Sequence, residues 1–452
     1  MSTHSNNIKK FTYHGIVDFT DKKEDRSPTK GIPKNLLQDF LNILGREILK
    51  EDQPKLEEIE QELQNLKKEK ENDQGQSDES KPFSGAFSGA SSIIVQLQES
   101  GYIKDSRKWL SKKGFFAVGS KLLQDVIRAL NKGPIGLHET TFSGTGSLNL
   151  DSSKKYEPGD DLRLINVPRS LLNAIERRSG SKSSLQLPID LQPDDLEVYE
   201  TKKDVSVAVV YCIDLSSTMK YSTMFGDMSR IEAAKKALWS LFLLNQKFFP
   251  SDSIYIVGFG ALASKVSPYD IPYLKTFESG VGFLHYTNYQ AAFRLAKKIL
   301  KNETTANKKI VLVTDGHPSA CFIDTEEERN KILGERPYSQ FYVPEKQALD
   351  SINEKQELSL DTKSGKIVYL CYRYRQVDQY IGEKTILEAK KCHKSGIEID
   401  TIMVSEEDSL LSYVNELEKF VKGRSYYINP AEIDKILITD YLNDKKLTLR
   451  SR

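Results

Sequence analysis

Short runs of β-branched and other apolar residues are the feature that most restricts the fold of this chain. The run VSVAVVYCI (205–213) is almost unbroken, and KIVLVTD (309–315) repeats its character farther along. Strands of this kind are buried on both faces, which is typical of a parallel sheet covered by helices on both sides. We therefore expect an α/β fold with a doubly wound, mainly parallel, Rossmann-like sheet flanked by helices.

Segments with helical spacing alternate with these runs over a domain predicted at 195–430. We expect helices near residues 230–248, 288–300, 384–395 and 408–421. Further central strands are predicted at SIYIVGF (253–259), KIVYLCY (366–372), EIDTIMV (398–404) and RSYYI (424–428). LEVYET (196–201) alternates like an edge strand. Residues 431–452 are expected to form a C-terminal helix or tail.

The chain before residue 195 is predicted to be helical at its start and mixed thereafter. Residues 1–68 form a helical N-terminal region, 69–92 a polar flexible linker, and 93–194 a mixed α/β region. A helix is expected at 120–132, with Ser120 as its cap and Gly133 as its stop. The apolar face of the first helix, within 34–50, consists of Leu36, Leu37, Phe40, Leu41, Leu44 and Ile48.

A short heptad-like pattern follows the first helix. Leu56, Ile59, Leu63 and Leu66 recur at spacings of three and four. This pattern fits a helix that packs on its own chain as well as a dimerising coiled coil, and both interpretations stay open.

Composition argues against a nucleic-acid or membrane partner. Lys and Arg number 65 against 64 Asp and Glu, so no net field attracts polyanions. No apolar run is long enough to span a membrane, and the first residues lack the apolar stretch of a secretory signal. The scattered Cys212, Cys321, Cys371 and Cys392 fit reduced thiols. We therefore expect a cytoplasmic protein.

Two of the predicted central strands end in an aspartate, and hydroxyl residues lie close by. Asp214 leaves the first strand and is followed by Ser216 and Thr218, whereas Asp315 leaves its strand into a turn that contains glycine. A second loop carries Thr287 just before an expected helix. In an open parallel sheet, ligands bind at the carboxyl ends of the strands.

Two carboxylates and three hydroxyls are the oxygen ligands that hard divalent cations prefer. Magnesium keeps several waters beside one or two carboxylates, so such a site leaves a position open for a further ligand. The sequence therefore predicts a Mg²⁺ site, with Mn²⁺ or Ca²⁺ as alternatives.

The segments Asp214-Leu-Ser-Ser-Thr-Met, Thr287-Asn288 and Thr314-Asp315-Gly316 resemble the three parts of the metal-ion-dependent adhesion site (MIDAS) of von Willebrand factor type A (VWA) domains. The resemblance implies a metal shell formed by Asp214, Ser216, Thr218, Thr287 and Asp315. It further implies that the open position takes an acidic side chain from a protein partner.

A narrower resemblance is carried by RIEAAKKALWSL, FFPSDSIYIVGFG and YTNYQAAFRLAKKIL, and by YEPGDDLRLINVPRSLLNAI before the domain. These segments are similar to bacterial and archaeal VWA proteins of the CoxE and magnesium-chelatase D-subunit group. That resemblance implies that the protein functions together with an AAA+ ATPase of the MoxR or chelatase type.

The chain departs from the pattern at three positions. Thr218 stands where serine is usual, Tyr286 where glycine commonly precedes the threonine, and His317 where this narrower group has an acidic residue. None of these changes removes a ligating oxygen, so they bear on affinity and partner choice.

Plainer interpretations exist for the same residues. Asp214 and Asp315 are also suited to capping loops and helix starts. His285 and His317 each lie two residues from a predicted ligand, and with Tyr286 they are expected to line the rim of the site. A zinc site would gather Cys or His at close spacing, which is not found here.

The main functional hypothesis is an interaction module that binds an Asp or Glu of a protein partner through its metal. The alternatives are a Mg²⁺-dependent phosphate-ester hydrolase, and a scaffold in which the metal is only structural. No catalytic motif is found, so we expect no enzyme. The stretch 316–365 exceeds an ordinary loop, and because it follows Asp315 we predict a lid or partner-contacting insertion near the metal.

Overall fold

The structure is a computed structural model, and it describes most of the chain from residue 34 onward. The described residues are 34–51, 58–59, 61, 93–106, 108–130, 148–156, 165–179, 191–202, 206–222, 228–279, 282–344, 350, 358–371, 377–404, 413, 423–427 and 433–450. The linker predicted at 69–92, the helix predicted at 408–421 except for Tyr413, the stop at Gly133 and most of the heptad pattern lie outside these residues.

A six-stranded sheet forms the centre of the molecule, as the apolar runs predict. Its order is β11-β10-β6-β3-β4-β5, and only β5 runs antiparallel to its neighbour. The strands are β3 (Val207–Asp214), β4 (Ser253–Phe259), β5 (Ala263–Val266), β6 (Asn307–Thr314), β10 (Ile397–Met403) and β11 (Ser425–Tyr427). All eight residues of β3 are buried, which confirms that this run lies between two layers of helices.

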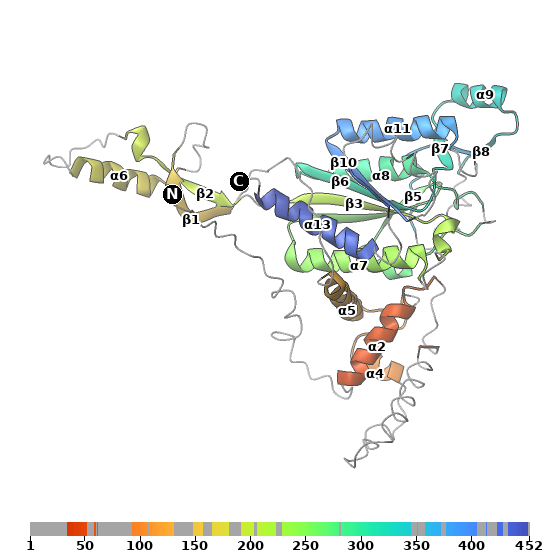
Figure 1. Cartoon of the computed structure of the whole chain (residues 1–452), viewed down its shortest axis with the longest axis horizontal. Coiled ribbons are helices and arrows are strands. Elements are labelled where there is room, and N and C mark those ends of the chain that lie inside the picture. The colour runs from red at the N-terminus through yellow and green to blue at the C-terminus, as the bar shows by residue number, and fades with distance from the viewer. Residues whose placement is uncertain are drawn as a thin grey trace, which may run out of the picture.

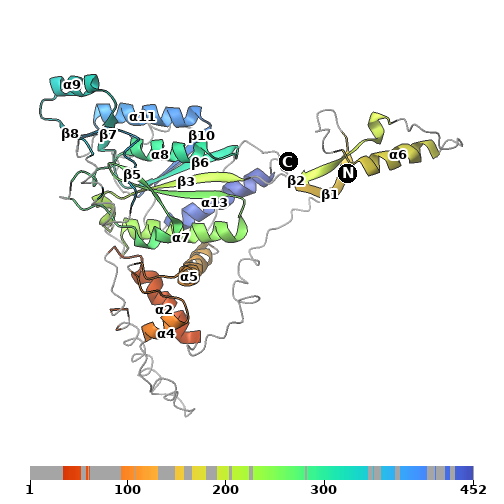
Figure 2. The same ribbon diagram turned by 180° about the vertical axis from the view of Figure 1, so that it is seen from behind.

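Helices cover both faces of this sheet (Figures 1 and 2). One face carries α8 (Tyr289–Lys301) and α11 (Gln379–Lys394), and the other carries α7 (Arg230–Phe248) and α13 (Ile433–Arg450). Among the helices that the structure describes, none has the length and apolar character that a membrane crossing requires.

Helix α7 is buried nearly all round, because a further layer of helices covers its outer side. α5 (Lys112–Leu130) packs on α7, and α2 (Lys34–Glu47) packs on α5 beside α4 (Ile93–Glu99) (Figure 1). Phe115 of α5 stacks on Trp239 of α7, with ring centroids 4.8 Å apart. The N-terminal helices therefore share one hydrophobic core with the sheet.

Helix α5 begins earlier than expected, and Ser120 does not cap it. Ser111 precedes the helix, and its hydroxyl accepts a hydrogen bond from the Gly114 amide at 3.0 Å. The two glycines of KKGFFAVG have low helix propensity, so the first part of the helix was not predicted from the sequence. Gly119 is required by packing, because a Cβ there would lie 2.4 Å from Trp239 Nε1 and 2.3 Å from Leu243 Cδ1.

The end of α2 is anchored to the loop around η5 (Pro268–Tyr273) by polar contacts. Glu51 accepts hydrogen bonds from the amide and the hydroxyl of Thr276. The fully buried Lys235 of α7 donates to the carbonyls of Leu274 at 3.0 Å, Pro272 at 3.4 Å and Lys50 at 3.5 Å. Burial lowers the pKa of Lys235 to about 7, despite the nearby Glu232 and Glu51.

The insertion between β6 and β10 forms a second, antiparallel sheet with the order β7-β9-β8. Its elements are β7 (Ala320–Ile323), α9 (Glu326–Glu335), β8 (Gln340–Tyr342) and β9 (Ile367–Leu370). The prediction of residues 366–372 as a strand of the main sheet is therefore wrong, since β10 pairs directly with β6. β9 is fully buried in its own small sheet, so its apolar run looked like that of a central strand.

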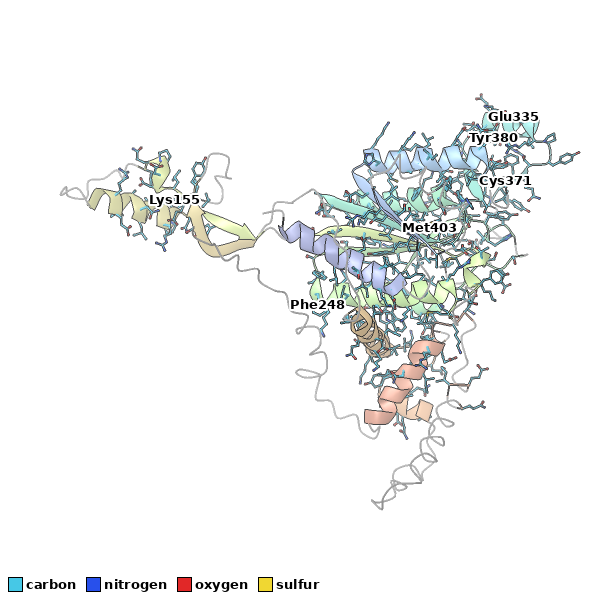
Figure 3. The ribbon with its side chains drawn as sticks, viewed as in Figure 1. Lys155, Phe248, Glu335, Cys371, Tyr380 and Met403 are labelled. Atoms are coloured by element: carbon cyan, nitrogen blue, oxygen red, sulfur yellow. The ribbon has the colours of Figure 1, made fainter. Side chains whose placement is uncertain are left out.

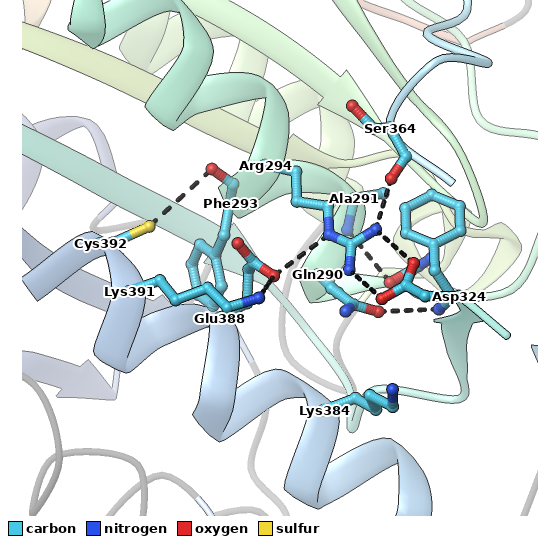
Figure 4. A network of polar contacts seen from close by, with 12 residues as sticks. Gln290, Ala291, Phe293, Arg294, Asp324, Ser364, Lys384, Glu388, Lys391 and Cys392 are labelled. Carbon is cyan, nitrogen blue, oxygen red and sulfur yellow. Dashed lines mark hydrogen bonds and ion pairs between the residues drawn. The ribbon is translucent and has the colours of Figure 1, made fainter. Parts of the chain in front are cut away.

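An ion-pair network fastens the insertion to the helical layer. Arg294 of α8 pairs with Asp324 at 2.9 Å and with Glu388 of α11 at 3.1 Å, and it donates to the carbonyl of Ser364 (Figure 4). Figure 3 shows Glu335 and Tyr380, which are joined by a hydrogen bond, at the outer end of this region.

A smaller unit precedes the main sheet along the chain. β1 (Leu148–Lys155) pairs antiparallel with β2 (Glu197–Lys202), beside α6 (Val167–Ser179) and the short helix η3 (Pro193–Asp195). The predicted strand at 196–201 thus exists, but it pairs with β1 and is not an edge of the six-stranded sheet. Arg177 of α6 forms a 2.8 Å ion pair with Asp195 in this unit.

We predict that Gly119→Val lowers the free energy of unfolding by ~2 kcal/mol, because the added methyl groups overpack the contact between α5 and α7. Urea denaturation followed by Trp fluorescence measures the loss, since Trp239 lies at this contact.

Gly334→Ala in α9 is the matched control, because a Cβ there meets nothing within 4 Å. We expect it to leave stability unchanged or slightly raised. Equal stability of Gly119→Val and the wild type would refute the packing role of Gly119.

Candidate metal centre

The first loop of the site begins where β3 ends. Asp214 is the last residue of β3, and the chain then turns into η4 (Ser217–Lys220). The Ser216 amide donates to Asp214 Oδ1 at 2.8 Å, which is the local turn that an aspartate after a strand favours. This bond turns the loop back on itself, so that the Ser216 and Thr218 hydroxyls lie 3.1 Å apart.

The third loop lies beside the first because β6 is the neighbour of β3. Ile213 is in register with Val313, so Asp214 and Thr314 come next to each other at the strand ends. The Thr314 hydroxyl donates to Asp214 Oδ2 at 2.6 Å. Thr218 Oγ1 donates to Asp315 Oδ1 at 2.9 Å, which joins the first and third loops. Asp214, Ser216, Thr218 and Asp315 therefore lie together at the ends of β3 and β6.

Thr287 is placed through the start of the insertion. Its amide donates to Ser319 Oγ at 3.0 Å, and its carbonyl accepts from the amides of Ser319 and Ala320. Within the described residues, Thr287 makes no hydrogen bond to the other four predicted ligands. Its neighbour Asn288 caps α8 and donates to the carbonyl of Ala261, which holds this second loop against the end of β4.

Both carboxylates of the site are buried, and their charges interact. Burial, and then the nearby charge of Asp315, raise the pKa of Asp214 to about 7. Burial also raises the pKa of Asp315, whereas the guanidinium of Arg230 and the Thr218 hydroxyl act in the opposite direction. Two buried carboxylates beside hydroxyl oxygens are a donor set that fits a hard divalent cation.

Arg230 lies at this site, although it was not among the residues predicted from the sequence. It is the first residue of α7, and its Nη1 forms an ion pair with Asp315 Oδ2 and lies 3.4 Å from the Thr218 carbonyl. Ser229 caps the helix in a reciprocal arrangement with Glu232, which fixes the start of α7. The pattern Ser229-x-x-Glu232 indicates that helix start, so the position of Arg230 next to the loop was open to prediction.

Tyr289 and Ser319 were also missed. The Tyr289 hydroxyl donates to the Gly316 carbonyl and lies 3.4 Å from Thr314 Oγ1, so it supports the third loop from α8. Ser319 connects the second loop to the insertion, because its carbonyl also accepts from the Cys371 amide at the end of β9.

The residues predicted for the rim lie on the second and third loops. The rings of His285 and Tyr286 are 4.5 Å apart, and burial lowers the pKa of His285. The ring of His317 lies 6.1 Å from that of Tyr413. Across the described part of the chain, no three His, Cys, Asp or Glu side chains are grouped as a metal cluster.

Two family models match this chain. "Rv0959-like protein, vWA domain" matches residues 207–341, and "Rv0959-like protein, third domain" matches residues 149–201. The uncharacterized protein Rv0959 of Mycobacterium tuberculosis (strain H37Rv) is 26% identical over 234 residues, which are 52% of this chain and 32% of that protein. The chain thus spans about a third of the length of the curated relatives that it matches.

Solved structures with similar folds include pilus and VWA proteins. The PilB minor pilin from Streptococcus sanguinis aligns with a TM-score of 0.38 at 15% identity, covering 60% of this chain and 69% of that one. The vWF domain of the type V pili tip protein Mfa5 from Porphyromonas gingivalis gives 0.36 at 18% identity, covering 55% and 97%. The SpRpn10 VWA domain gives 0.28 at 14% identity, covering 51% and 93%. From the family match to residues 207–341 and the strand order of the sheet, we conclude that this chain contains a VWA domain, a fold known for protein interaction.

Proposed function

We propose that the VWA domain holds one divalent cation, Mg²⁺, through Asp214, Ser216, Thr218, Thr287 and Asp315. The cation would offer an open coordination position to the side chain of an Asp or Glu on a protein partner. The protein's role in this proposal is binding, and it includes no catalytic step.

One observation carries the proposal: hydrogen bonds link the ends of the first and third loops from Asp214 to Asp315. Thr314 Oγ1 and the Ser216 amide donate to Asp214, the Ser216 and Thr218 hydroxyls lie 3.1 Å apart, and Thr218 Oγ1 donates to Asp315. Two carboxylates buried this closely repel one another, and a cation between them would offset that cost. Hydroxyls that already point toward each other need little rearrangement to act as ligands.

The donor set favours hard cations. All five predicted ligands offer oxygen, which suits Mg²⁺ and, with looser geometry, Mn²⁺ or Ca²⁺. Thr218 keeps the hydroxyl that serine supplies in similar proteins and directs it at Asp315. His317 and Tyr286 flank the loops, so they would contact the partner's acidic segment.

We further propose that the partner is an AAA+ ATPase of the MoxR or chelatase type, or a client that it remodels, in the cytoplasm. The support is the resemblance of the segments around the site, and of the segment before the domain, to the CoxE and chelatase D-subunit group. The proposal of this partner is based on sequence similarity, whereas the proposal of a metal site is based on the arrangement of its predicted ligands.

We expect isothermal titration of the full chain with Mg²⁺ or Mn²⁺ to show one bound ion, and Asp214→Asn to abolish binding. The change removes one negative charge and one strong ligand while it keeps the side-chain shape.

Asp252→Asn is the matched control, because Asp252 is a buried aspartate just before β4, at the opposite end of the strands. It accepts from the Val207 amide and the Tyr441 hydroxyl, so its loss should lower stability and leave metal affinity unchanged. Absence of binding by the wild type would remove the metal from the proposed function.

In the absence of divalent cations, we predict that Asp214→Asn raises the melting temperature by a few degrees, equivalent to ~1–2 kcal/mol. The reason is that the variant removes one of two buried carboxylates that repel each other. Saturating Mg²⁺ should raise the melting temperature of the wild type and leave that of the variant unchanged. A variant less stable than the cation-free wild type would show that the repulsion is small.

We expect a MoxR-type AAA+ ATPase from the same genome to co-precipitate with the full chain in the presence of Mg²⁺. This co-precipitation should be lost when EDTA is added or when the chain carries Asp315→Ala. Asp252→Asn should retain the ATPase. Retention by Asp315→Ala would indicate a scaffold that binds through other surfaces, with a structural metal.

A further inference from the structure

We infer that Arg230 is a built-in competitor of the cation and sets the affinity of the metal centre. This inference rests on the proposed metal site and goes beyond it, because it names a residue outside the ligand set. The guanidinium is tethered at the start of α7 and neutralises Asp315 when no cation is bound.

The contacts of Arg230 place its positive charge directly on the predicted metal shell. Nη1 of Arg230 pairs with Asp315 Oδ2, while Asp315 Oδ1 accepts from Thr218 Oγ1. The same Nη1 lies 3.4 Å from the carbonyl of Thr218. Two of the five predicted ligands are therefore contacted by one guanidinium group.

Arg230 is held in this place by the fold. It is the first residue of α7, and the Ser229–Glu232 cap fixes that helix start. Its backbone amide also approaches the carbonyl of Tyr221 at the end of the first loop, at 3.4 Å. Its side chain is four-fifths buried, whereas that of the nearby Lys220 is about half exposed and lies 3.9 Å from Glu51. Of these two basic residues, Arg230 therefore points into the site, whereas Lys220 is directed toward Glu51.

The charges of Asp214, Asp315 and Arg230 determine whether Arg230 strengthens or weakens cation binding. When both are ionised, Asp214 and Asp315 carry two negative charges, and Arg230 cancels one of them. A dication entering beside Arg230 meets a like charge at short range, whether or not the ion pair with Asp315 breaks. Removing the positive charge should therefore strengthen cation binding, in contrast to the usual effect of removing a residue from a site.

The test is calorimetric titration of the full chain with Mn²⁺ and with Mg²⁺. Arg230→Gln removes the charge and keeps a planar polar group, and we expect its affinity for the ion to exceed that of the wild type by about tenfold or more. Arg230→Met, a second neutral variant, should show the same increase. Arg230→Lys keeps the charge and should stay within about threefold of the wild type.

Arg177→Gln is the control, because it breaks a comparable Arg–Asp pair in the unit of β1, β2 and α6. Its affinity should equal that of the wild type. Neutral variants that bind as the wild type does, or more weakly, overturn the inference and leave the proposed function in place; Arg230 would then be a residue that positions Asp315. Absence of binding by the wild type and all variants overturns both.

Discussion

The pairing of β3 with β6 is the interaction on which the site depends. Because these strands are parallel neighbours in register, their last residues come together and place Asp214 beside Thr314 and Asp315. Burial of the strands removes water from the carboxylates, so their charges must be offset by protein groups or by a cation. The Thr314 and Thr218 hydroxyls and Arg230 supply what the protein itself can offer. The remaining negative charge supports the proposal of a cation at this end of the sheet.

The two additions to the sheet act on different sides of the site. The N-terminal helices cover α7, and Glu51 at the end of α2 binds Thr276 behind the first loop. The insertion contacts the second loop, where Ser319 binds both the amide and the carbonyl of Thr287. Arg294 and its acidic partners then fasten the insertion to α8 and α11 (Figure 4). The surroundings of the first loop and the second loop itself are therefore supported by elements from outside the six-stranded sheet.

The sequence was most informative where one residue pattern has one structural meaning. Mainly apolar runs predicted β3, β4, β6 and β10, and aspartates at two strand ends predicted Asp214 and Asp315 as neighbours. It was least informative where different folds bury the same pattern: the run at 367–370 is as apolar as a central strand, but it lies in the small antiparallel sheet. The start of α5 was predicted too late, because glycine has low helix propensity. At Gly119 a side chain is excluded by the close packing against Trp239. A role for Arg230 at the site could not be predicted from the sequence, because arginine is common at helix starts. Only its contact with Asp315 in the structure indicates that role.

The position of Arg230 also bears on which ligand completes the shell. A guanidinium beside the site repels a cation but attracts a carboxylate, so the same charge has opposite effects on the two proposed ligands. A partner's Asp or Glu would add a negative charge that is attracted both to Arg230 and to the cation. The partner's carboxylate and the metal should therefore bind with positive coupling, each offsetting the charge that disfavours the other. A site that holds only a structural cation gains nothing from that positive charge, whereas a site that binds a partner's carboxylate does.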